Sequence, residues 1–255
     1  MNRVLTLAKF NIGILLSQRT WFFLSWALFG LQISIYGSLM SKLVSTTKLP
    51  DYFFFYAIGL MVIIVFDSGA DVGRHFVEHA HEGELPYFLS LPISRRGFLA
   101  SQALYGVVNT MVKVLPPLLG VLYFLGRLTV QGVVFSMLAL FLLGLGISGI
   151  MISFSFIAFK SVDIYSAVLA SLSAVLVRFS TIFYPLIVMP NFYSPVSSLN
   201  PLTYGADLTR WILGYDPSYL LNPTVAAVVV TAVAVGTLSL SAGIVDKIIE
   251  GVKAA

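Results

Sequence analysis

Long stretches of this sequence carry no charged residue, and this feature most limits what the chain can fold into. The run from 130 to 159 contains no Asp, Glu, Lys or Arg, and over all 255 residues only 10% are charged while 58% are hydrophobic. A soluble domain carries about 25% charged residues, because water must solvate its surface. This chain cannot cover its surface in that way, so its solvent must be lipid. We predict an all-α integral membrane protein.

The apolar runs predict six transmembrane helices in a single membrane domain, residues 1–255, at about 20 apolar residues per crossing. The predicted spans are residues 21–40, 52–71, 99–124, 130–159, 163–181 and 224–245. Of the 15 Lys and Arg residues, nine fall on one side of these spans, four on the other side and two inside spans. Loops rich in Lys and Arg stay in the cytoplasm. We therefore expect a cell-membrane protein with both termini cytoplasmic, surrounded by lipid and without a nucleic-acid partner.

Two polar segments are expected on the cytoplasmic side. Residues 1–19 contain Arg3, Lys9 and Arg19 but no acid, and their apolar residues recur at helical spacing. This pattern predicts an amphipathic helix in the membrane interface. A secretory signal is the alternative, but no A-x-A-like cleavage site follows. Residues 74–98 form the most polar block of the chain and predict a cytoplasmic loop.

The segment before the last span breaks the apolar pattern. Residues 182–222 contain five prolines and eight aromatic residues. Asn200 followed by Pro201 is typical of a helix cap and first helical position, and Gly214 is typical of a helix end. A helix between these positions is too short to cross a membrane. We predict a re-entrant or interfacial element on the outer side.

Three ionisable residues inside the predicted spans are candidates for lining a transport pathway: Asp67, Lys113 and Arg178. A cation at the centre of a membrane helix costs about 2.5–3.5 kcal/mol on insertion scales. A rise of about 1.5 Å per residue places both cations at similar depth, more than about 10 Å from Asp67, so neither is expected to pair with it. Two interpretations stay open. The cations face a pathway and favour an anionic headgroup, or they snorkel to the outer interface.

Polar residues at the end of the second span are expected to pair locally. Asp71 has helical spacing to Arg74 and His75 and can bond to either along one face. All three histidines of the chain lie nearby, but H-E-x-x-H is absent, so a solvated, partner-facing helix accounts for them. Asp67 and Asp71 could alternatively hold Mg²⁺ between their carboxylates. That arrangement would suit an intramembrane enzyme acting on lipid headgroups.

Residues 144–149 spell G-x-G-x-x-G, the pattern of a dinucleotide-binding loop. That loop needs a strand before it and an acidic residue about 20 positions later. Here the motif lies inside an uninterrupted apolar run. Small residues let membrane helices approach closely, so we expect these glycines to serve packing.

The order of these elements resembles the ABC-2 type permeases, the transmembrane subunits of ATP-binding-cassette exporters. The shared features are an amphipathic N-terminal helix, six spans, a charged loop after the second span and a proline-rich outer segment before the sixth. The local matches are Glu82-Gly83-Glu84-Leu85 and Leu91-Pro92-Ile93-Ser94-Arg95 in the loop, and Asn200-Pro201-Leu202-Thr203-Tyr204 before the last span.

The resemblance implies a role for each segment. The 74–98 loop looks like the coupling helix that docks on a cytoplasmic ATPase subunit, and the 1–19 helix looks like a second contact with that subunit. The implied contact residues are Glu82, Gly83, Glu84, Leu85, Pro92, Ser94, Arg95 and Arg96. The 182–222 segment resembles the re-entrant helices that cap the exit of the family's pathway. The implied outer gate residues are Asn200, Pro201 and Tyr204.

The same resemblance implies a function and partners. Six spans are half of what the family uses, so a second permease copy is implied, identical or different. The chain contains no G-x-x-x-x-G-K-[ST] loop, so it has no cofactor of its own, and ATP and Mg belong on the partner ATPase. The predicted function is export of an amphipathic or hydrophobic substrate of the drug, lipid or glycan class, with no catalytic residue and no metal in this chain. The alternatives are the enzyme described above and a non-transporting membrane scaffold, which would need neither Lys113 nor Arg178.

Overall fold

The fold is a bundle of long helices, seen in a computed structural model that describes residues 9, 12, 13, 17, 19–44, 49–82, 95–157 and 161–253. No strand occurs among these residues, so the predicted all-α class is confirmed for them. The α-helices are α2 (Arg19–Gln32), α3 (Ser38–Leu43), α4 (Tyr52–His81), α6 (Arg95–Phe124), α7 (Val130–Ile157), α8 (Val162–Arg178), α9 (Ser194–Ser198), α10 (Pro201–Ile212) and α11 (Pro223–Lys253). A π-helical turn at Ile33–Gly37 joins α2 to α3, and 3₁₀ turns cover Leu186–Val188 and Pro217–Tyr219.

Five helical segments among the described residues are long and apolar enough to cross a membrane. They are Arg19–Leu43, Tyr52–Glu78, Gly97–Phe124, Val130–Ser155 and Pro223–Ser241. These segments give the chain the architecture of a multi-pass membrane protein. The predicted fifth span corresponds to α8, whose 17 residues extend about 25 Å, less than the ~30 Å hydrocarbon core.

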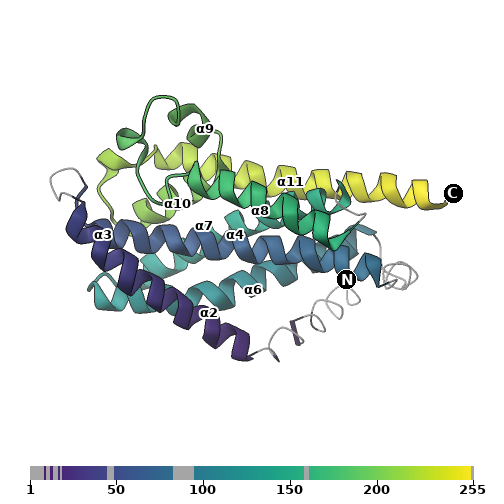
Figure 1. Ribbon diagram of the computed structural model, residues 1–255, viewed down its shortest axis with the longest axis horizontal. Helices are drawn as coiled ribbons and strands as arrows, with labels where there is room; N and C mark the ends of the chain where they lie inside the picture. Colours follow the sequence, from purple (N-terminus) through teal and green to yellow (C-terminus); the bar gives the residue numbers. More distant parts are fainter. Residues whose placement is uncertain are drawn as a thin grey trace.

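Long helices that follow one another in the chain run in opposite directions along the bundle (Figure 1). Later residues of α4 contact later residues of α7, because Gly69 lies against Ile147 and Gly73 lies against Met151. These two helices are therefore parallel. The contacts of α7 with α11 advance in the same way, so all three point in one direction. By contrast, α2, α6 and α8 run the other way (Figure 1). We call the end that carries the end of α4 and the start of α6 the loop end, and the opposite end the α10 end.

The centre of the bundle is α4, most of which is buried, whereas α2 and α11 expose most of their apolar side chains. The exposed apolar faces are those that lipid would solvate. Close contact between α4 and its neighbours depends on small residues. The hydroxyl of Tyr165 on α8 donates to the Ala70 carbonyl at 2.9 Å, and a Cβ on Gly73 would lie only 2.2 Å from that hydroxyl. Gly73 therefore lets α8 pack directly on α4.

The sequence signals at both ends of α10 are confirmed, and α11 begins with a cap of the same kind. The Asn200 side chain accepts from the Leu202 N–H at 3.0 Å, and the Asn222 side chain accepts from the Thr224 N–H at 2.9 Å. Gly214 has a φ of 77°, a left-handed conformation that glycine adopts without strain, and it ends α10. The second predicted span is longer than residues 52–71, because α4 continues without a break to His81.

Two predicted segments fall mainly outside the described residues. They are most of the 1–19 amphipathic helix and residues 83–94 of the 74–98 loop.

Candidate functional site

A cavity of about 430 Å³ lies between α2, α4, α6 and α8. We call it the central cavity. Its polar lining comes mainly from one face of α4, with Asp67, Ser68, Asp71 and Arg74, and from Lys113 on α6. Its apolar lining includes Trp21 and Phe29 on α2, Leu60, Ile63 and Ile64 on α4, and Leu169 on α8. Charged groups that face a cavity inside a membrane bundle mark a functional site by default, because burying them there costs stability.

Lys113 forms an ion pair with Asp71, which corrects the expectation that Asp71 pairs locally. The Lys113 Nζ lies 3.1 Å from an Asp71 carboxylate oxygen, and the Lys113 side chain is 8% exposed. Asp71 had been expected to pair locally with Arg74 or His75. The His75 ring instead contacts the backbone carbonyl of Asp71 at 2.8 Å.

No Lys113–Asp67 ion pair occurs among the described residues, as expected, but the depth estimate placed Lys113 too far from this part of α4 because it compared positions along the helix axes alone. Side chains on a helix tilt towards its N-terminus. The N-terminus of α6 lies at the loop end, and that of α4 lies at the α10 end (Figure 1). Lys113 therefore reaches towards the loop end while Asp71 leans the opposite way, and their charged groups meet. The long lysine side chain covers the remaining distance.

Asp67 lies one turn from Asp71 and forms no hydrogen bond or ion pair within the described part of the chain. Its side chain is exposed, and it lines the central cavity. The hydroxyl of the next residue, Ser68, is fully buried and has no hydrogen-bond partner among the described residues. A carboxylate and a hydroxyl without protein partners leave this part of the cavity able to bind a further polar group.

Arg178 does not join this site. It occupies the last turn of α8, where a cation interacts favourably with the helix dipole, and its side chain is exposed. It is not among the residues that line the central cavity. The structure thus separates the two cations that the sequence placed at similar depth.

A magnesium site between Asp67 and Asp71 finds little support in this geometry. Asp71 is engaged by Lys113, whose positive charge opposes binding of a second cation to that carboxylate. In the part of the chain that the structure describes, no group of three or more His, Cys, Asp or Glu side chains could hold a metal ion.

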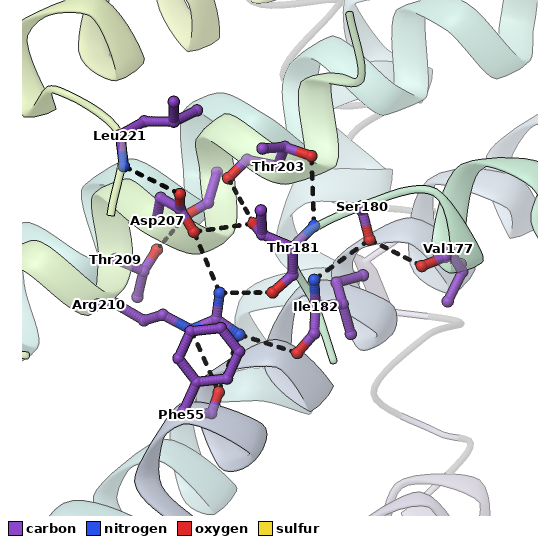
Figure 2. A network of polar contacts seen from close by, with 11 residues as sticks. Phe55, Val177, Ser180, Thr181, Ile182, Thr203, Asp207, Thr209, Arg210 and Leu221 are labelled. Carbon is purple, nitrogen blue, oxygen red and sulfur yellow. Dashed lines mark hydrogen bonds and ion pairs between the residues drawn. The ribbon is translucent and has the colours of Figure 1, made fainter. Parts of the chain in front are cut away.

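A second charged cluster lies at the α10 end, and the sequence did not predict it. Arg210 on α10 is completely buried, although it lies in the 182–222 segment that the sequence predicted on the outer side. Figure 2 shows its guanidinium surrounded by oxygen atoms and lying flat on the Phe55 ring, with its carbon 3.4 Å from the ring centre. The guanidinium donates to the carbonyls of Phe55, Thr181 and Ile182 at 2.7 to 3.2 Å. Its contact with the Asp207 carboxylate at 3.2 Å completes five donor contacts.

Asp207 is the acidic half of this cluster. One carboxylate oxygen accepts from the Thr181 hydroxyl at 2.8 Å, and the other accepts from the Leu221 N–H at 3.1 Å. Burial raises the pKa of Asp207, and the adjacent Arg210 opposes that rise. Burial also lowers the pKa of Arg210 to about 10, so the guanidinium stays charged at neutral pH. The pair ties together α4, α10, the end of α8 and the segment that leads into α11.

Close approach at this cluster requires a glycine on α4. A Cβ on Gly59 would lie 2.2 Å from the Ile182 carbonyl oxygen and 3.0 Å from an Arg210 nitrogen. Together Arg210, Asp207 and Gly59 form what we call the Arg210 cluster. Its donors and acceptors satisfy one another, so the cluster holds these segments together. We call such a fully hydrogen-bonded cluster a lock.

The three outer gate candidates lie beside this lock. The Asn200 side chain donates to the carbonyls of Leu176 and Phe179 at 2.6 and 3.0 Å, which fastens the start of α10 to the end of α8. Pro201 is the first residue of α10, and the Tyr204 hydroxyl donates to the Ser198 carbonyl at 2.6 Å. These contacts describe an anchored segment, and the gating role stays a prediction.

The predicted ATPase-contact residues are only partly described. Glu82 is exposed, and its N–H donates to the Glu78 carbonyl at the end of α4. Arg95 and Arg96 begin α6, but their side chains lie outside the described part. The other predicted contacts, Gly83, Glu84, Leu85, Pro92 and Ser94, also lie outside it.

The G-x-G-x-x-G pattern serves packing, as expected. It lies within α7, where Gly146 faces Val233 and Ala234 of α11, and Gly149 faces Thr237. The Thr237 hydroxyl donates to the Gly146 carbonyl at 3.0 Å.

Comparison with known proteins adds no family to this picture. No protein-family model matches the chain, and no curated protein shows significant similarity to it.

Proposed function

We propose that this chain is a membrane transport subunit whose central cavity forms part of the substrate pathway. The observation that carries the proposal is the partly unpaired polar lining of that cavity, with Asp67 and Ser68 facing it from the most buried helix. A scaffold without a transport role has no need for a free carboxylate at this position, because an uncompensated charge destabilises a membrane bundle. In a transport subunit, a bound substrate would interact with this carboxylate and compensate its charge.

The proposed topology has six membrane crossings, with α8 as the fifth. Because α7 and α11 run in the same direction, α7 ends at the loop end and α11 starts at the α10 end. The chain must return along the full length of the bundle between them, and α8 is the helix that makes this return. Residues adjoining its 17-residue length complete the crossing.

Within the transport class, we propose an ABC-2 type exporter permease, assembled as a dimer with a cytoplasmic ATPase that binds ATP and Mg. The support is the order of sequence elements together with the position of the 74–98 loop. In six crossings with cytoplasmic termini, α4 and α6 present this loop on the cytoplasmic side, where an ATPase would dock. The substrate moves outward and is not chemically changed.

Copurification tests the exporter proposal. We expect the full chain, tagged at its C-terminus and extracted from its own cells in mild detergent, to carry an ATPase that hydrolyses ATP. The double variant Glu84→Ala/Arg95→Ala should insert into the membrane and lose coupling between ATP hydrolysis and transport. A chain that purifies without ATP hydrolysis but converts lipid headgroups would instead establish the enzyme alternative.

Cysteine labelling tests the topology, because the chain contains no native cysteine. Single cysteines at Asp163 and Gly251 should react with an impermeant maleimide only after the cells are permeabilised. A single cysteine at Ser218 should react in intact cells. Equal reactivity of Asp163→Cys and Ser218→Cys in intact cells would place both ends of α8 on one side and would rule out six crossings.

A further inference from the structure

We propose that the central cavity binds an amphiphile through a primary or secondary ammonium group, with Asp67 as its counter-ion. The inference rests on the proposed function, because it names the substrate class of the same cavity. It reverses the charge sign of the hypothesis in which Lys113 and Arg178 attract an anionic headgroup. Three features of the cavity lead to it.

The first feature is the distribution of charge. Lys113 and Asp71 neutralise one another at 3.1 Å. Arg74 is exposed, one turn beyond Asp71, with Glu78 one further turn along the same face. Of the four charged residues in the lining, this leaves Arg74 at the loop end and Asp67 about two turns deeper, so the deep part of the cavity carries the Asp67 carboxylate. A charge at that depth is weakly screened, so it favours a cationic ligand.

The second feature is the unpartnered hydroxyl beside this carboxylate. Ser68 lines the cavity and is fully buried, and its oxygen has no partner among the described residues. A buried polar group without a partner costs free energy, and a ligand that supplies the missing hydrogen bond recovers it. An ammonium group in the cavity can donate to Asp67, and rotation of the Ser68 side chain towards the cavity would let its hydroxyl accept a second hydrogen bond, whereas a quaternary ammonium has no N–H to donate.

The third feature is the apolar part of the lining, on α2 and α4. Trp21 and Phe29 on α2 face the cavity together with aliphatic side chains of α4. The volume of about 430 Å³ is within the range of about 300–1,000 Å³ that is usual for small-molecule sites. Aromatic rings also attract cations through their faces. The lining therefore fits a molecule with one cationic group and an aromatic or aliphatic body.

Two probes of matched size and opposite charge test the inference. The full chain is placed in phosphatidylcholine nanodiscs, and binding of tritiated 2-phenylethylammonium is compared with binding of tritiated 3-phenylpropionate at neutral pH. We expect saturable binding of the ammonium probe and none of the carboxylate. Equal or tighter binding of the carboxylate, or no saturable binding of either probe, would overturn the inference.

Variants identify the group that binds. Asp67→Asn should weaken ammonium binding by about tenfold or more, the size expected for a hydrogen bond to a charged group. Asp163→Asn is the matched control, since Asp163 is exposed in the first turn of α8, and it should change affinity less than about twofold. Lys113→Gln should shift affinity upwards by about threefold or more, because it frees the Asp71 carboxylate.

The opposite signs of the Asp67→Asn and Lys113→Gln effects separate binding from folding. A misfolded variant loses affinity in both cases, so a gain in Lys113→Gln cannot come from damage to the bundle. Ammonium binding that is unchanged in Asp67→Asn, or weakened in Lys113→Gln at full folding, would contradict the inference.

The source of the ammonium group is resolved by changing the lipid. If the natural occupant is a lipid headgroup, phosphatidylethanolamine in the nanodisc should compete and weaken probe binding. If it is a soluble amine, the affinity of the probe should stay the same. Either result supports binding through an ammonium group. The assay uses the chain alone, so failure to find an ATPase would overturn the exporter proposal and leave this inference standing. If an ATPase copurifies but ammonium binding does not depend on Asp67, the exporter proposal stands and this inference is overturned.

Discussion

The two charged clusters inside the helix bundle differ in how far their polar groups are satisfied by protein partners. In the Arg210 cluster, all five guanidinium contacts and both carboxylate oxygens of Asp207 have protein partners. In the central cavity, Lys113 and Asp71 form an ion pair, whereas the Asp67 carboxylate and the Ser68 hydroxyl have no hydrogen-bond partner among the described residues. The comparison teaches that charge inside a membrane bundle is not by itself a sign of a pathway. Saturated hydrogen bonding indicates a lock, and unsatisfied groups beside a cavity indicate a binding site.

The largest expected effect comes from opening the lock. Arg210→Gln leaves Asp207 as an uncompensated buried charge and removes donors from three carbonyls, so we expect a loss of about 3–5 kcal/mol in the free energy of unfolding. The measurement is reversible or kinetic unfolding of the purified chain in detergent. Arg210→Lys should not rescue it, because an ammonium lacks the planar set of donors. A loss below about 1 kcal/mol would contradict the lock.

A smaller effect should follow from crowding the same cluster without changing its charges. Gly59→Ala places a methyl group 2.2 Å from the Ile182 carbonyl, and we expect it to cost about 1–3 kcal/mol. Gly120→Ala in α6 is the matched control, since a Cβ there meets nothing within 4 Å. Alanine also suits a helix better than glycine, so the control should be neutral or slightly stabilising. Equal effects of the two substitutions on the unfolding temperature would show that the close contact at Gly59 is unimportant.

The Lys113–Asp71 ion pair should contribute less to the free energy of unfolding than the Arg210 cluster. Lys113→Gln removes the partner of an Asp71 carboxylate that is 30% exposed, so solvent compensates part of the loss. We expect Lys113→Gln to lower the free energy of unfolding by about 1–2 kcal/mol in the same measurement. This value lies between the losses typical of surface ion pairs and of buried ion pairs. A loss as large as that of Arg210→Gln would show that the two clusters are equally structural.

The smallest effect should come from the exposed pair at the α10 end. Arg127 lies 3.0 Å from Asp51, and both side chains are 35% exposed. Exposed pairs contribute about 0–1 kcal/mol. Arg127→Gln should therefore shift the unfolding temperature only slightly, and added salt should reduce the shift further. It also serves as the charge-matched control for Arg210→Gln.

Much of the helical framework could be predicted from the sequence, because its signals are local. Apolar runs predicted the long helices, and Asn200 with Pro201 predicted the start of α10; the Asn222 cap at the start of α11 acts in the same way. Each cap acts through a hydrogen bond two residues away, so the sequence pattern and the physical cause coincide.

The Arg210 cluster could not be predicted in the same way. Most of its acceptors are backbone carbonyls of distant segments, and a carbonyl has no signature in the sequence. The one available signal was the Asp207–Arg210 spacing of three residues on a short helix, which places the two charges on one face. The sequence analysis did not use this signal, because it selected only the ionisable residues inside the predicted spans.

The central cavity was partly predicted. Asp67 and Lys113 were selected because ionisable residues inside membrane spans are costly. The pairing of Lys113 with Asp71 was missed because depth was counted along the helix axes without the direction of the side chains. Arg178 was grouped with Lys113 by depth alone, and its place in the last turn of α8 separates it.

The measurement that tests this account most directly is the Asp67→Asn variant, followed in parallel for unfolding and for ammonium binding. The account predicts an unfolding temperature equal to or slightly above that of the parent chain, because an unpaired carboxylate is removed from the bundle. It predicts that the same sample binds 2-phenylethylammonium about tenfold more weakly. A marked fall in unfolding temperature with unchanged ammonium binding would show that Asp67 is structural, and would contradict the account.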